Sequence, residues 1–334
     1  MNPSVIIRLT PWVPVLLLAS LPRIPATPAW DVQKFLKDYE ADTRPVCPTG
    51  LSGHHRRKRI VGGRTAQLLE YPYAVSIRKR LKGTSSKPFP FCGGALLTER
   101  HVLTAAHCLN RKSPKILSVN IGDYNFASSH DTENHVRSVT TFEQHEEYDV
   151  PSYRNDIAIV YLNESVSLLQ NGLETAILPP LYSDVTPGTV ARVVGWGRLR
   201  YGGPKSNILR KVDIPVVNRT ICQRPLKHRI FPLMVCAGGI EGKDACIGDS
   251  GGPMLIQVDS YHVVAGVVSF GKKCALKDVY GVYTRLGLYG PWIYQKTMDA
   301  ECKPAFTADR DYPWRSYKGS DDLEFDHITH NTIK

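Results

Sequence analysis

The chain has 334 residues, of which 42% are hydrophobic and 22% charged, a composition that is ordinary for a globular protein. Its formal net charge of +11 favours contact with polyanions. No nucleic-acid-binding motif accompanies the charge, so we exclude nucleic acid as a partner.

The N-terminus predicts a secretory signal peptide over residues 1–29. Arg8 supplies a positive charge before the short apolar run Trp12–Ala19, and small residues follow at Ala26 and Ala29. The run is too short to span a bilayer, and no later segment of the sequence reaches that length. We therefore expect a secreted, extracellular protein without a membrane segment.

Residues 30–59 form a polar segment with one cysteine, and this segment ends in four consecutive cations, Arg56–Arg59. Such a run is usually a solvated patch. Here, however, Ile60, Val61 and two glycines follow the last arginine without a spacer, and a solvated patch does not explain that junction.

The region from 60 to 302 has the pattern of an all-β protein. Short apolar, β-branched runs such as "YAVSI", "DIAIVYL" and "VVAGVVSFG" are separated by Gly, Pro and Asn turns, which is typical of a barrel or a sandwich. One helix is predicted after Gly290, where Pro291 suits a first helical position. Residues 303–334 are polar without apolar periodicity, so we expect a disordered tail.

Secretion makes the cysteines candidates for disulfide bonds. Their even number, eight, allows 105 complete pairings, and spacing does not choose among them. Two sequons, at Asn163 and Asn218, predict N-glycosylation.

The strongest chemical signal is Ser250 in the stretch "GDSGGP", where the glycines let the backbone turn tightly. A nucleophilic serine needs a base, and the base usually needs a carboxylate. His107 in "LTAAHC" and Asp156 in "NDIAI" are the candidates. Alone, each would be read as a structural histidine and a turn aspartate.

The motifs "RIVGG", "LTAAHC", "NDIAI" and "GDSGGP", in that order, resemble the chymotrypsin-like (trypsin-fold) serine proteases over residues 60–300. The resemblance implies an all-β fold of two packed antiparallel β-barrels with a C-terminal helix and an active site between the barrels. It also implies that Ser250 is the nucleophile, His107 the general base and Asp156 the carboxylate that orients it. The backbone N–H groups of Gly248 and Ser250 would form the oxyanion hole.

The same resemblance explains the basic run. Cleavage between Arg59 and Ile60 would free a new amine, which inserts into the protein and pairs with Asp249. The chain would therefore be a zymogen, activated by a trypsin-like or a furin-like protease.

Substrate preference follows from the primary pocket. Asp244, six residues before Ser250, matches a trypsin-type pocket floor, and Gly271 and Gly281 match its walls, with Ser269 also counted as a substrate-binding residue. Ala245 carries no hydroxyl to help bind an ammonium, so we expect cleavage after Arg in preference to Lys.

By resemblance, three disulfides are expected, Cys92–Cys108, Cys222–Cys236 and Cys246–Cys274. Cys47 and Cys302 remain, and we infer that they pair. Activation would then leave a two-chain enzyme.

No cofactor is required for this chemistry, although calcium or sodium are candidate structural ions. Asp123 and Glu133 lie in the place of the calcium loop of trypsins and carry hard oxygen ligands. Tyr280 matches the tyrosine of relatives that bind sodium beside the pocket, and the alternative is a tyrosine that only fills space.

A basic loop, Ile77–Pro88, includes Arg78, Lys79, Arg80 and Lys82 and no acidic residue. It is either a solvated loop or an exosite for an acidic protein, an inhibitor or a heparin-like polyanion.

The sequence therefore predicts a secreted serine endopeptidase zymogen that acts in an extracellular proteolytic cascade or as a venom component. Its expected partners are protein substrates cleaved after Arg, an activating protease and protein inhibitors. The alternatives are a digestive trypsin-like enzyme and a non-catalytic protease homologue that acts as a binding protein. The presence of His107, Asp156, Ser250 and Asp244 disfavours the last of these.

Overall fold

The computed structural model describes residues 32–49, 63–80, 88–128, 130–168, 172–226, 228–242, 244–272, 274, 276–307 and 313–316. The chain divides into two compact units, 1–41 and 42–334. In the first unit the structure describes one amphipathic helix, α1 (Val32–Ala41). The predicted signal peptide and the Arg59–Ile60 junction lie outside the described residues.

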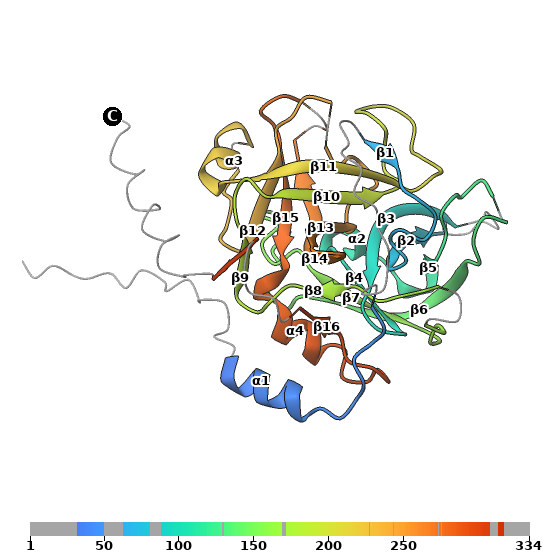
Figure 1. Ribbon diagram of the computed structural model, residues 1–334. Coiled ribbons are helices and arrows are strands. Elements are labelled where there is room, and N and C mark those ends of the chain that lie inside the picture. Colours follow the sequence, from blue (N-terminus) through green and yellow to red (C-terminus); the bar gives the residue numbers. More distant parts are fainter. Residues whose placement is uncertain are drawn as a thin grey trace, which may run out of the picture. The chain divides into compact units, whose positions relative to one another are not determined.

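Six antiparallel strands of the second unit close into a first barrel (Figure 1). Its core includes fully buried side chains such as Val119 and Ile121. The strands follow one another around the barrel in the order β2 (Ala74–Lys79), β3 (Phe89–Leu96), β4 (His101–Thr104), β7 (Ala158–Leu162), β6 (His135–Gln144) and β5 (Leu117–Ile121).

A second ring of six antiparallel strands forms because β13 (Pro253–Val258) pairs with both β10 (Val190–Gly195) and β14 (Tyr261–Gly271). Its core is apolar and includes Val193, Ile214, Met254 and Tyr283. The short strand β1 (Arg64–Thr65) pairs with β11 (Arg210–Val217). The ring runs β13 (Pro253–Val258), β10 (Val190–Gly195), β11 (Arg210–Val217), β12 (Met234–Gly238), β15 (Tyr280–Arg285) and β14 (Tyr261–Gly271). The predicted fold class of two β-barrels is confirmed.

Helices are short in the second unit. The predicted C-terminal helix is α4 (Gly290–Gln295), which has Pro291 at its start and buries Trp292 and Ile293. The other helical segments described in this unit are too short to show a helical period in the sequence. They are the helices α2 (Ala106–Leu109) and α3 (Arg219–Leu226) and the 3-10 turns η1 (Pro114–Ile116) and η2 (Leu286–Leu288). No helix among the described residues is both long and apolar enough to cross a membrane.

The prediction of a disordered tail from residue 303 is wrong for its first part. Strand β16 (Ala305–Phe306) pairs in parallel with β8 (Ile177–Leu178), and β17 (Trp314–Ser316) pairs with β9 (Ser183–Val185). Two apolar side chains, Ala305 and Trp314, are buried. Strands of two or three residues leave no periodic pattern, so the sequence could not reveal them. Residues 308–312 and 317–334 lie outside the described residues.

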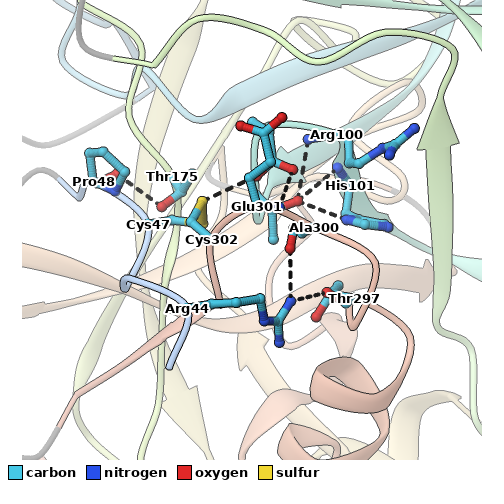
Figure 2. Close-up of a disulfide and its surroundings, with 12 residues drawn as sticks. Arg44, Cys47, Pro48, Arg100, His101, Thr175, Thr297, Ala300, Glu301 and Cys302 are labelled. Carbon is cyan, nitrogen blue, oxygen red and sulfur yellow. Dashed lines mark hydrogen bonds between the residues drawn. A yellow bond between two sulfur atoms is a disulfide. The ribbon is translucent and has the colours of Figure 1, made fainter. Parts of the chain in front are cut away.

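Within the second unit, a disulfide and hydrogen bonds tie the segment Asp42–Thr49 to residues 297–303 (Figure 2). Cys47 is bonded to Cys302, and its N–H donates to the Lys303 carbonyl over 2.9 Å. The Arg44 guanidinium donates to the carbonyls of Thr297 and Ala300 at 2.8 and 3.2 Å. The segment before the Arg59–Ile60 junction is thus held by hydrogen bonds as well as by its disulfide.

Candidate active site

His107 and Asp156 are brought together by the first barrel. His107 lies in α2, which follows β4, and Asp156 lies just before β7, the strand that pairs with β4. His107 Nδ1 is 2.8 Å from Asp156 Oδ2, and the His107 backbone N–H donates to Asp156 Oδ1 over 2.8 Å. A carboxylate at Nδ1 keeps the proton there and leaves Nε2 as the acceptor.

The Asp156 side chain is fully buried, so its oxygens need hydrogen-bond partners. Besides His107, the Ser269 hydroxyl donates to Asp156 Oδ2 over 2.5 Å. Thr284 anchors the backbone of the same residue, because its hydroxyl donates to the Asp156 carbonyl over 2.7 Å. Ser269, predicted as a substrate-binding residue, therefore also orients the carboxylate.

Backbone conformation and close packing explain why glycines flank Ser250. Gly248 has φ = +106° and Gly251 has φ = +79°, values that side chains rarely adopt. A Cβ on Gly251 would also collide with the Thr104 hydroxyl and the Gly93 carbonyl. The Gly93 N–H donates to the Ser250 carbonyl over 2.8 Å. The serine loop of the second barrel is thus packed against β3 and β4 of the first.

One pocket of about 260 Å³ collects the predicted catalytic and substrate-binding residues. Asp156 is the exception, since it lies behind His107. The Cys246–Cys274 disulfide also borders the pocket. The predicted residues on its wall are His107, Asp244, Ala245, Ser250, Ser269, Gly271 and Gly281.

An aromatic wall beside the pocket is absent from the sequence-based prediction. Tyr153 meets the His107 ring edge-on with centroids 5.8 Å apart, and it packs on Phe270 at 5.0 Å. Tyr153 and Phe270 line the pocket, and His228 packs on Phe270. The available signal was their position, since Tyr153 precedes Asp156 by three residues and Phe270 follows Ser269.

A second cavity, of about 290 Å³, lies behind the serine loop, and Asp249 and Gly63 are among its lining residues. The Asp249 carboxylate accepts hydrogen bonds from the backbone N–H groups of Gly197 and Cys246 at 2.8 and 2.9 Å. Burial raises the pKa of this carboxyl, against the lowering effect of the two N–H groups. Among the described residues, no side-chain cation forms an ion pair with it.

The structure pairs all eight cysteines as the sequence analysis expected, in the bonds Cys47–Cys302, Cys92–Cys108, Cys222–Cys236 and Cys246–Cys274. The two groups of described side chains that come close enough for metal binding each contain a disulfide. Their sulfurs are therefore not available as thiolate ligands.

The candidate ion and glycan residues lie at separate places. Asp123 is bound by Asn120 and by the Arg78 guanidinium, the latter at 3.1 Å. The two proposed calcium ligands are Asp123 and Glu133, and the first of them, Asp123, is already paired with the Arg78 cation. Tyr280 packs in a cluster with Cys236 and Val282, and its role in sodium binding stays a prediction.

Asn163 and Asn218 are both exposed, as glycosylation requires. The Asn218 side chain also accepts a hydrogen bond from the Thr220 N–H at the start of α3.

Comparison with known proteins gives a consistent result. The Trypsin family model matches residues 60–293. The chain is 36% identical over 249 residues to the proclotting enzyme of Tachypleus tridentatus, with 70% of this chain and 65% of that protein aligned. It is 34% identical over 238 residues to coagulation factor IX of Oryctolagus cuniculus, covering 70% and 83%. It is 36% identical over 244 residues to trypsin zeta of Drosophila melanogaster, covering 70% and 84%. The chain thus spans slightly less than two thirds of the length of the proclotting enzyme.

Proposed function

Since the chain belongs to the trypsin family of serine proteases, we propose that it is a secreted endopeptidase made as a zymogen. Cleavage at Arg59–Ile60 activates it, and the active enzyme cleaves proteins after Arg, then after Lys. Ser250 attacks the scissile carbonyl, His107 Nε2 takes its proton and returns it to the leaving amine, and Asp156 stabilises the imidazolium.

The observation that carries the zymogen proposal is the cavity beside Asp249. A buried carboxylate without a cation is costly, and the cavity of about 290 Å³ has room for a small apolar residue with a free amine. Gly63, three residues after Ile60, lines the same cavity, so the new terminus is short enough to reach it. An ammonium at Asp249 would then favour the ordered form of the loop that carries Gly248 and Ser250.

The preference for Arg is supported by the position of Asp244. This carboxylate lines the same pocket as Ser250. A substrate whose basic side chain binds Asp244 would therefore have its scissile bond close to the nucleophile. A guanidinium makes two parallel hydrogen bonds to a carboxylate, whereas an ammonium is a point charge.

For the physiological role we propose an extracellular proteolytic cascade or a venom. The proclotting enzyme and factor IX are named for clotting, and the segment Asp42–Thr49 stays attached to the domain through Cys47–Cys302. Its partners would be an activating protease, protein substrates and protein inhibitors. A digestive role is the second candidate, because trypsin zeta is equally similar to this chain.

A heparin-like polyanion remains a proposed partner of the basic loop, with a changed set of residues. Arg78 is engaged by Asp123 and lies over the Phe126 ring at 4.7 Å, so it contributes less net charge than the sequence suggested. Lys79 and Arg80 form no ion pair with the described residues, and Lys82 lies outside them. Their neutralisation is expected to lower the salt concentration at which the protein elutes from a heparin column.

The decisive test is hydrolysis after controlled activation. The purified chain would be cleaved at Arg59–Ile60 and profiled on a peptide library, with Ser250→Ala as the matched inactive variant. We expect cleavage after Arg. In Ser250→Ala the rate of hydrolysis should fall until it is only roughly 10³–10⁴-fold above the uncatalysed rate in water. Equal hydrolysis by the two proteins would instead support the non-catalytic homologue.

A further inference from the structure

A cation lies beside Gly248 but outside the pocket that holds Asp244. Lys205 Nζ donates to the Pro90 carbonyl over 2.8 Å. A Cβ built on Gly248 would lie 3.2 Å from Lys205 Cε and 3.5 Å from its Nζ. Lys205 is exposed, and it faces Arg198 across an isolated antiparallel bridge. The Arg198 guanidinium donates to the Gly203 carbonyl, and its charge acts on Lys205, so two cations lie near the proposed oxyanion hole.

Two more cations lie over the phenylalanines that flank Pro90. Lys79 Nζ is 5.3 Å from the ring centroids of both Phe89 and Phe91. Lys112 Nζ is 5.8 Å from the Phe91 centroid. Aromatic faces attract cations, so the two rings hold these ammonium groups near the outer end of β3.

The four residues Lys205, Arg198, Lys79 and Lys112, which we call the basic cluster, have no ion-pair partner in the part of the chain that the structure describes. Partial loss of solvent around its side chain lowers the pKa of Lys205, and so does the nearby charge of Arg198. Burial and the charge of Lys79 lower the pKa of Lys112. The carboxylate that acts on Lys205 is that of Asp249, whose oxygens are already bound by backbone N–H groups. A carboxylate from a ligand would relieve this repulsion.

The path of a substrate brings one of its side chains to the basic cluster. The side chain before the scissile bond enters the pocket at Asp244, and the scissile carbonyl points at the N–H of Gly248. In an extended chain, side chains alternate between opposite faces. The side chain of the second residue after the scissile bond therefore points to the same face as the side chain in the pocket, at a position beyond Gly248. Lys205 lies beside Gly248 and donates to the carbonyl of Pro90, the residue before Phe91, and neither Lys205 nor Phe91 lines the pocket.

We propose that Lys205, with Arg198, Lys79 and Lys112 around it, binds an acidic side chain at the second substrate residue after the scissile bond. Protein substrates of this enzyme would thus combine a basic residue before the bond with Asp or Glu two residues beyond it. This inference rests on the proposed function, because it uses Ser250 and Gly248 as the catalytic centre.

The test uses the activated full-length protein and three internally quenched peptides that differ only at that second residue, which is Glu, Gln or Lys. For the wild type, kcat/KM for the Glu peptide is expected to exceed that for the Gln peptide about three- to fivefold at low salt, as for an exposed ion pair. The ratio is expected to approach one near 1 M salt, where the screening length is about 3 Å.

The variants assign the effect to the cluster. Lys205→Gln is expected to bring the Glu-to-Gln ratio close to one, and Lys205→Glu to favour the Lys peptide. The matched control Lys115→Gln removes an exposed cation from η1 and is expected to keep the wild-type ratio. Equal ratios in wild type and Lys205→Gln, with hydrolysis intact, would overturn this inference alone. An absence of Ser250-dependent hydrolysis would overturn the proposed function as well.

Discussion

Replacement of Asp249 by asparagine is expected to have opposite consequences before and after activation. In the uncleaved protein the carboxylate has two backbone N–H donors, at 2.8 and 2.9 Å, and borders the second cavity. Asparagine carries no charge, so the desolvation of an unpaired anion disappears, and this gain offsets the loss of one of the two N–H···O hydrogen bonds. The uncleaved variant should therefore be no less stable than the wild type in urea unfolding at neutral pH.

In the cleaved protein the same substitution removes one partner of the proposed ion pair between Asp249 and the Ile60 amine. Breaking a buried pair costs about 3–5 kcal/mol. At about 1.4 kcal/mol per tenfold change, this predicts a fall in kcat/KM of roughly 150- to 5,000-fold. The size of the loss reflects a smaller fraction of molecules with an ordered serine loop.

The assay compares kcat/KM on an arginine peptide for both proteins, after N-terminal sequencing has confirmed the new Ile60 end. Asp259→Asn is the matched control, because Asp259 is an exposed turn residue with φ = +45°, a conformation that asparagine tolerates. A cleaved Asp249→Asn protein within about threefold of wild-type activity would refute this account of activation, since the estimated loss is far larger.

Four further outcomes are expected. Arg59→Gln should be secreted and folded but nearly inactive, measured on an arginine peptide after exposure to the activator, and full activity without cleavage would contradict the zymogen proposal. Activated protein should run as one band without reductant and as two with reductant on a denaturing gel because of Cys47–Cys302, whereas two bands without reductant would disprove the covalent link. Under native conditions the reduced chains should stay together in size-exclusion chromatography, held by the hydrogen bonds of Arg44. Burial lowers the pKa of His101 from 6.5 to about 4, although Asp299 lies 3.0 Å from its Nε2. Between these two pH values the folded state therefore binds fewer protons than the unfolded state. The contribution of His101 to the free energy of unfolding should be complete above pH 6.5, and this free energy should fall by about 3 kcal/mol as the pH is lowered to 4. A His101→Gln protein with the same loss over that range would show that other groups cause it.

The sequence predicted the catalytic residues and the two β-barrels through the family resemblance that its short motifs carry, whereas the strand pattern alone left a barrel or a sandwich open. His107, Asp156 and Ser250 each stand in a short motif, and β-strands leave alternating apolar runs between turn residues. The helix after Gly290 was also predictable, since Pro291 marks its start. These features need no knowledge of which segments meet.

Contacts between distant segments could be found only in the tertiary structure. Ser269 donates to Asp156 across 113 residues, and the strands β16 and β17 exist because β8 and β9 offer edges to them. Arg78 forms an ion pair with Asp123, which lies outside the basic loop in the sequence. Lys205 meets Gly248 and Pro90 from a separate loop, which places a cation beside the serine loop. The physical reason is common to these cases. Hydrogen bonds and charges act over a few ångströms in space, and chain folding alone decides which residues come within that range.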